Sequence, residues 1–122
     1  MLRLTLPLPP SKNRSHHWVK IGKGWRRVPT KDMEKWWHHA RVAGFTAMWD
    51  QQFECAVDGK VVVRFWCYWP DLRTHDAGNM IDPLLDGLNG VCYADDCQAL
   101  PRAIDFELCR ADPRLEVEVD RL

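Results

Sequence analysis

The sequence predicts one α/β (α+β) domain in which a single mixed β-sheet packs against two main helices. Residues 61–69 are β-branched and aromatic on both faces, which is typical of a central strand. Residues from Thr30 onward place apolar side chains at helical spacing over about 20 residues. At 122 residues the chain is long enough for one core, so we expect residues 1–122 to form a single domain.

The first half predicts a strand, a long connection, a helix and the central strand. Leu2, Leu4 and Leu6 alternate with polar residues, and Pro7 stops that strand. Residues 7–29 show no sustained periodicity, although a minor hairpin around Gly22 and Gly24 is possible. Thr30 is a plausible N-cap for the helix, because acidic residues follow in its first turn.

The second half predicts a short helix followed by two strands. Asn79 is the expected N-cap, Asp82 then stands at its third position, and Gly90 closes the helix. Residues 104–108 and 115–119 alternate apolar and acidic residues, with Asp112-Pro113 as a turn between them. We expect these two segments to form an antiparallel pair.

Composition excludes several classes of protein. No apolar run approaches the roughly 20 residues of a membrane span, and the N-terminus lacks a signal-peptide pattern, so we expect a cytoplasmic protein. Five cysteines without a CxxC pair favour reduced thiols over a disulfide framework or zinc knuckle. The histidine pairs at 16–17 and 38–39 do not favour zinc either, because adjacent side chains point in different directions.

The zero net charge hides two oppositely charged halves. Residues 1–69 carry 12 Lys and Arg against 5 Asp and Glu, whereas residues 70–122 carry 5 against 12. Such a division suggests one surface for a polyanion and another for cations, although the halves could simply attract one another.

The acidic half concentrates aspartates. Between Arg73 and Arg102 there is no Lys or Arg, yet five aspartates occur: Asp76, Asp82, Asp86, Asp95 and Asp96. Neighbouring carboxylates repel one another unless a cation lies among them, and Mg²⁺ favours a few carboxylates with water and phosphate oxygens. Each aspartate could instead cap a helix or decorate a turn, and Asp82 fits that reading well.

The basic half interleaves cations with tryptophans. Residues 10–41 carry nine Lys and Arg residues together with Trp18, Trp25, Trp36 and Trp37. Cations neutralise phosphates and exposed rings can stack on unpaired bases, a combination that suits distorted DNA. For any single tryptophan, packing in the core is the competing reading.

Two stretches of sequence resemble the RusA family of Holliday-junction resolvases. They are Leu6–Arg14, which carries Pro-Pro-Ser-Lys-Asn-Arg, and the acidic stretch formed by His75–Asn79, Leu85–Gly90 and Tyr93–Gln98. The resemblance spans nearly the whole chain. It implies a homodimeric, Mg²⁺-dependent endonuclease that makes paired symmetric nicks in four-way or other branched DNA during recombination and repair, often encoded by bacteria, phages or prophages.

The resemblance also implies roles for individual residues. Asp76 and Asp96 match metal-binding carboxylates of the family, and Asp95 matches the first member of its acidic pair. We expect DNA to contact the basic residues of the first segment and one asparagine beside them: Lys12, Asn13, Arg14, Lys20, Lys23, Arg26 and Arg27.

The chain departs from the family pattern at two positions. Gly78 replaces a catalytic aspartate, and Asp82 replaces a lysine. One hypothesis is compensation, in which Asp82 supplies the missing metal ligand from one helical turn away and joins Asp76 and Asp96 in catalysis. The other is a weakened protein of the same fold that binds junctions and cuts them slowly or not at all.

Overall fold

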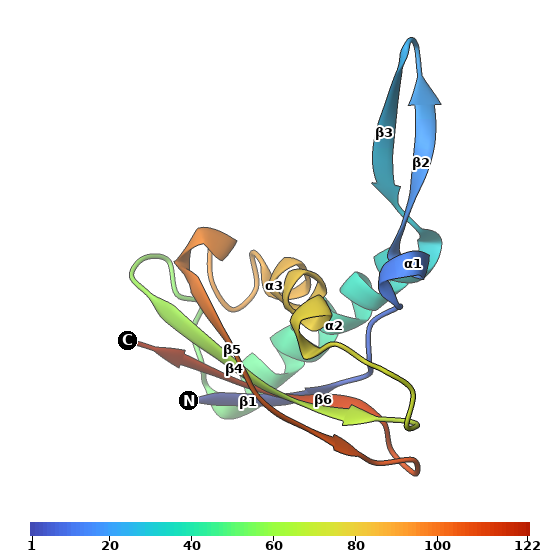
Figure 1. The fold of residues 1–122 in the computed structure, drawn as a ribbon. Coiled ribbons are helices and arrows are strands. Elements are labelled where there is room, and N and C mark those ends of the chain that lie inside the picture. Colours follow the sequence, from blue (N-terminus) through green and yellow to red (C-terminus); the bar gives the residue numbers. More distant parts are fainter.

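The four-stranded sheet is organised around β4 (Val61–Trp69), and the computed structural model describes residues 1–122 (Figure 1). β6 (Arg114–Arg121) pairs with β4 antiparallel on one side, and β5 (Ala99–Leu108) pairs with it parallel on the other. β1 (Leu2–Leu6) completes the order β1-β6-β4-β5 by pairing antiparallel with β6. The predicted central strand and the mixed α+β architecture are confirmed.

The predicted pairing of the last two strands is wrong. β4 lies between β5 and β6, so these strands run in opposite directions without sharing a hydrogen-bonded ladder. Phe106 and Leu108 are 63% and 44% exposed on this edge strand, although their alternation suggested a buried face. Local alternation identifies a strand, but it does not say which strand lies beside it.

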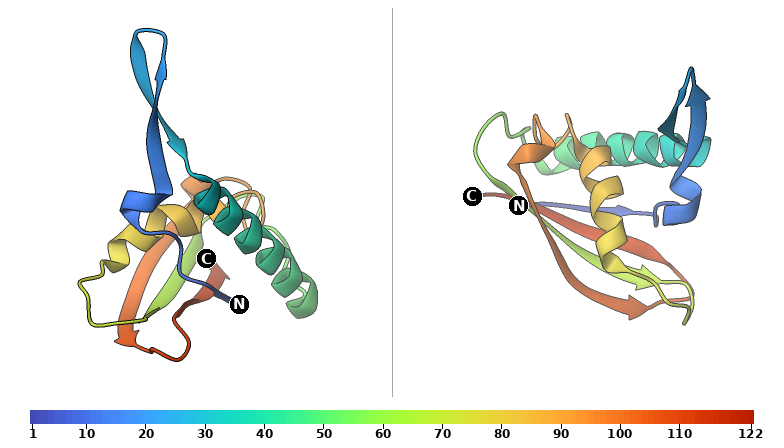
Figure 2. Two further views of the ribbon diagram at one scale, coloured as in Figure 1. Left: turned by 90° about the vertical axis from the view of Figure 1, so that its right-hand side faces the viewer. Right: turned by 45° about the horizontal axis from the view of Figure 1, so that its top comes forward.

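Two helices cover one face of the sheet (Figures 1 and 2). The long helix α2 (Lys31–Gln51) begins as predicted, because the Thr30 hydroxyl accepts a hydrogen bond of 3.2 Å from the Met33 backbone N–H. The short helix α3 (Ile81–Leu88) crosses it closely at Gly87. A Cβ there would lie 3.0 Å from Ala40 Cβ and 3.1 Å from Trp36 Cζ3, so the absence of a side chain allows the approach.

The core lies between these helices and the sheet. It contains apolar residues of every sheet strand but β5, together with residues of both helices: Leu2, Leu4, Leu6, Met33, Trp36, Ala40, Val61, Val63, Phe65, Leu84, Leu88, Leu115, Val117 and Val119. The opposite face of the sheet carries ion pairs such as Arg64–Asp120 at 2.9 Å. No helix combines the length and apolar character needed to cross a membrane. All five cysteines are free thiols.

The connection between β1 and α2 is far more regular than its sequence indicates. A single helical turn, α1 (Lys12–Ser15), leads into the antiparallel hairpin of β2 (His16–Ile21) and β3 (Gly24–Pro29). Gly22 has a φ of 59° at the first position of the two-residue turn, a conformation that glycine adopts readily. The hairpin projects well away from the body of the protein (Figures 1 and 2).

Candidate active site and nucleic-acid interface

Asp76 is placed by the loop that follows β4. The His75 ring stacks on Trp69, with centroids 4.7 Å apart and planes inclined by 17°, and its Nε2 lies 2.8 Å from an Asp71 carboxylate oxygen. The hydrogen bond from His75 lowers the pKa of Asp71. These contacts hold the loop that leads to Asp76. The Asp76 carboxylate accepts a 2.8 Å hydrogen bond from the Gly78 N–H and caps the 3₁₀ turn η1 (Ala77–Met80).

This cap corrects the sequence prediction for the second helix. α3 begins at Ile81, and Asn79 lies inside the preceding 3₁₀ turn rather than at an N-cap. Asp76 caps that 3₁₀ turn, whereas α3 itself begins without a side-chain cap, and Asp82 is exposed in its first turn. A Cβ at Gly78 would lie 3.1 Å from Asp76 Oδ1, the acceptor of the Gly78 N–H, so a larger residue there would require a small shift of this carboxylate.

The second acidic turn is held by its own side chains. The Asp95 carboxylate accepts a 3.0 Å hydrogen bond from the Cys97 N–H, and the Gln98 side-chain oxygen accepts one from the Asp95 N–H, which forms a capping box around η2 (Asp96–Gln98). The Cys97 N–H is the main cause of the lowered pKa of Asp95. Gln98 also donates to the carbonyls of Ala56 and Gly59, at 3.3 and 3.1 Å. The turn is therefore tied to the body of the domain.

Asp86 joins the acidic group and was not predicted as a site residue. Burial raises its pKa, and the negative charges of Asp82 and Asp96 raise it further. Asp82 and Asp86 are four residues apart on α3 and so share one face of the helix, a spacing that was readable in the sequence. The structure thus brings Asp82, Asp86 and Asp96 within electrostatic range of one another.

The other predicted ligands are engaged differently. Asp76 and Asp95 each accept a backbone hydrogen bond in their own turn. No three His, Cys, Asp or Glu side chains are arranged so that they could hold a metal ion by themselves. The carboxylates consequently do not form an all-protein cage.

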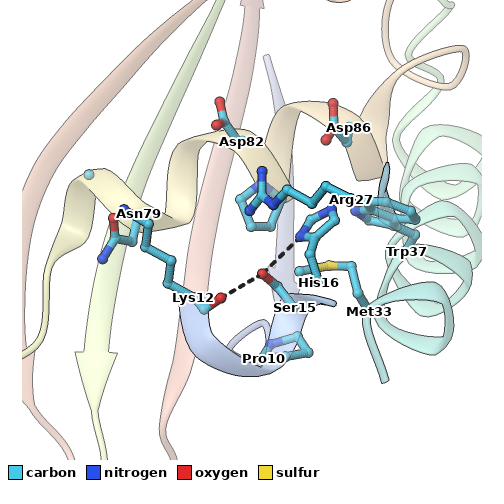
Figure 3. Close-up of a pocket in the computed structure, with 12 residues that line it drawn as sticks. Pro10, Lys12, Ser15, His16, Arg27, Met33, Trp37, Asn79, Asp82 and Asp86 are labelled. Carbon is cyan, nitrogen blue, oxygen red and sulfur yellow. Dashed lines mark hydrogen bonds between the residues drawn. The ribbon is translucent and has the colours of Figure 1, made fainter. Parts of the chain in front are cut away.

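A polar cavity of about 580 Å³ joins the acidic helix to the basic segment (Figure 3). Asp82 and Asp86 line it from α3, and Lys12, His16 and Arg27 line it from α1 and the hairpin. At its base, the Ser15 hydroxyl lies 2.9 Å from His16 Nδ1 and donates to the Lys12 carbonyl at 3.0 Å. Burial lowers the pKa of His16, and Arg27 lowers it further. Opposite charges therefore face one space.

The predicted DNA-contacting residues all lie on α1 and the hairpin. Lys12, Asn13 and Arg14 are exposed on α1, and the exposed cations of the hairpin are Lys20, Lys23, Arg26 and Arg27. Thr30 ties the base of this basic unit to α2, since its hydroxyl donates to the Arg14 carbonyl at 2.7 Å. No acidic residue occurs between Arg14 and Lys31.

A model of the endodeoxyribonuclease RusA family matches residues 7–120, nearly the whole chain. The chain belongs to the RusA family. No curated protein matches it at a significant level. RusA proteins are endodeoxyribonucleases that act on Holliday junctions, so this RusA chain is a DNA-hydrolysing enzyme of a family that binds branched DNA. The match covers the hairpin, both acidic turns and the residues that line the cavity.

Proposed function

We infer that the chain resolves four-way DNA junctions by paired, symmetric, Mg²⁺-dependent nicks, acting as a homodimer in recombination and repair. The observation that carries this inference is the cavity in which Asp82 and Asp86 face Lys12 and Arg27. The anionic phosphodiester would bind to the basic side chains, and the carboxylates would hold a divalent cation beside it. One cavity offers both within a RusA-family chain.

The carboxylates suit a metal ion that is shared with the substrate. Mg²⁺ keeps several waters and commonly takes only one or two protein carboxylates besides phosphate oxygens, so a closed three-ligand group is not required. Burial raises the pKa of Asp86, and the negative charges of Asp82 and Asp96 raise it further; a divalent cation would relieve the repulsion among these carboxylates. We propose that the carboxylates that would hold such an ion come from Asp76 and Asp96, together with Asp82 or Asp95.

A cation held by these carboxylates would supply a water of lowered pKa and would stabilise charge on the phosphoryl oxygens. The protein's own side chains do the positioning. Lys12 and Arg27 line the basic side of the cavity, where they would bind the non-bridging oxygens of the scissile phosphate, and Asp82 lines the acidic side. Asp76 and Asp96 would join Asp82 in catalysis by holding the cation. Asn13, Arg14, Lys20, Lys23 and Arg26 hold the neighbouring backbone.

Asp82 is proposed to replace the ligand absent at Gly78. Both residues line the same cavity, and Asp82 lies in the first turn of α3, from which a side chain can lean toward the helix N-terminus. One chain supplies one such site. Two-fold symmetry in a homodimer would place two sites on symmetry-related strands, which is what paired nicks require.

The test compares cleavage of a labelled four-way junction with cleavage of a linear duplex of matched sequence, with and without Mg²⁺. Asp76→Asn and Asp82→Asn should each lower the rate of junction cleavage by at least roughly a hundredfold, because each removes a ligand whose charge is needed in the transition state. Asp50→Asn, an exposed carboxylate on α2, is the matched control and should leave the rate unchanged. An unaffected rate in Asp82→Asn would refute its assigned role.

The alternative is a protein that binds junctions but cuts them weakly. Two observations favour it. The chain departs from the family pattern at Gly78 and Asp82, and the Asp76 carboxylate already accepts a backbone hydrogen bond in its own turn. Tight and selective junction binding by the wild-type protein, with no Mg²⁺-dependent product, would establish this alternative. Paired nicks confined to the junction would exclude it.

A further inference from the structure

Two tryptophans of the hairpin lie on one face of the ribbon, and the fold makes no use of them. Trp18 and Trp25 are each 66% exposed, although large aromatic side chains usually bury most of their surface. Trp18 pairs with Arg27, and Trp25 pairs with Lys20. Because paired residues share a face and faces alternate along each strand, all four side chains project from the same side of the hairpin.

The pairing places one cation directly opposite each ring. Paired side chains in an antiparallel ladder have Cβ atoms about 5 Å apart. Neither tryptophan ring is stacked on another aromatic ring or covered by a cation in the structure, where the aromatic and cation–π contacts involve other residues. Each ring therefore offers a free surface beside a positive charge, which matches the base and the phosphate of a single nucleotide.

Charge distinguishes this patch from an exposed aromatic surface at the end of α2. Phe45 and Trp49 are 55% and 85% exposed near the end of α2, but their neighbours there are Asp50 and Glu54. Arg121 lies over the adjoining Phe53 ring, so that surface has mixed charge. The hairpin has four cations and no acidic residue, so its charge is complementary to a polyanion.

We propose that the face formed by Trp18, Lys20, Trp25 and Arg27 stacks on bases that lack a stacked neighbour, at the point of strand exchange in a four-way junction. The proposal rests on the proposed function and deepens it, because it assigns junction selectivity to stacking rather than to charge. Arg27 also lines the cavity shared with Asp82, so this face continues from the tip of the hairpin to the candidate active site. A base stacked on the hairpin positions the adjoining phosphate there.

The first experiment measures dissociation constants for a four-way junction and a linear duplex in EDTA, where nothing is cleaved. Trp18→Ala/Trp25→Ala should weaken junction binding by roughly tenfold or more and leave duplex binding within about twofold, because only the junction offers unstacked bases. The slope of affinity against salt should stay unchanged, since no cation is removed. Trp18→Phe/Trp25→Phe should restore most of the affinity.

Val19→Ala is the matched control, because Val19 lies on the same strand but projects from the opposite face. It should leave both affinities unchanged. Circular dichroism and the thermal midpoint of the double alanine variant should match those of the wild type, given that the hairpin lies outside the core. If the wild type itself shows no preference for the junction, the proposed function fails, whereas a preference retained in the double variant overturns only the stacking.

Crosslinking locates the contact independently of affinity. A 5-iododeoxyuridine placed at the exchange point should, on irradiation, form a crosslink that mass spectrometry maps to Trp18 or Trp25. The same base placed within an arm should give none. Crosslinks from the arm alone, an equal weakening of junction and duplex binding, or conversion of a dimer to a monomer by Trp18→Ala/Trp25→Ala would each overturn the proposal.

Discussion

The basic hairpin and the acidic turns differ in how much of the protein holds them in place. The hairpin is a two-stranded ribbon outside the core, anchored at its base by Thr30. The second acidic turn is tied to a fully buried group. Tyr93, which is 0% exposed, precedes the second turn and donates a 2.7 Å hydrogen bond to the Leu85 carbonyl of α3.

This difference separates two tasks that an endonuclease of branched DNA must perform. Groups that orient a reacting phosphate need fixed positions, because small displacements cost large factors in rate. A two-stranded ribbon is marginally stable alone and can adapt to its partner. We therefore expect changes in the hairpin to alter binding without altering stability, and changes behind the acidic turns to alter both stability and cleavage.

The largest expected effect is that of removing Tyr93. Tyr93→Ala should lower the free energy of unfolding by about 3–5 kcal/mol, as truncation of large buried aromatic residues does. Tyr93→Phe keeps the ring and removes only the hydrogen bond to Leu85, so it should cost about 1 kcal/mol. Denaturant unfolding of both variants measures the two contributions. Equal decreases would show that the hydrogen bond, and not packing, anchors the turn.

The sequence predicted the parts of the fold that the core fixes. The strand at residues 2–6, the helix capped by Thr30 and the central strand at 61–69 all carry a buried apolar pattern, and that pattern is legible locally. The hairpin has both faces in water, so it has no alternation to read beyond the turn glycines. The neighbours of β5 were missed because strand order depends on residues far apart in the chain.

The candidate site was predictable in composition but not in grouping. The aspartates were recognised from their density, yet Asp76 caps the 3₁₀ turn η1, and α3, for which the sequence predicted Asn79 as the cap, begins without a side-chain cap. Asp86 belongs to the acidic group because α3 turns it toward Asp82 and Asp96. Aspartate and asparagine satisfy the capping rules about equally well, and only the folded chain decides which of several nearby residues caps a turn.

The second prediction concerns the hairpin, where we expect a change in DNA binding without a change in stability. Lys20→Gln, Lys23→Gln and Arg26→Gln together should reduce the salt slope of junction binding by up to about 0.9 for each phosphate that is no longer neutralised. The free energy of unfolding should change by no more than about 0.5 kcal/mol for each substitution. Lys60→Gln/Arg110→Gln removes exposed cations elsewhere and is the control. A large drop in stability would mean that the hairpin is part of the cooperative fold.

The smallest expected effect lies where the two regions meet, at Asp86. Burial and the neighbouring carboxylates raise its pKa, so its ionisation costs more in the folded protein than in the unfolded chain. Stability is therefore lost as pH rises through the folded pKa, and the penalty is absent below the ordinary aspartate pKa of about 3.9. Asp86→Asn should raise the thermal midpoint at pH 7 in EDTA and leave it unchanged below that pKa. Asp58→Asn, an exposed carboxylate, is the control. An equal shift at both pH values would show that the asparagine acts through packing, and that charge repulsion at this boundary contributes nothing to stability.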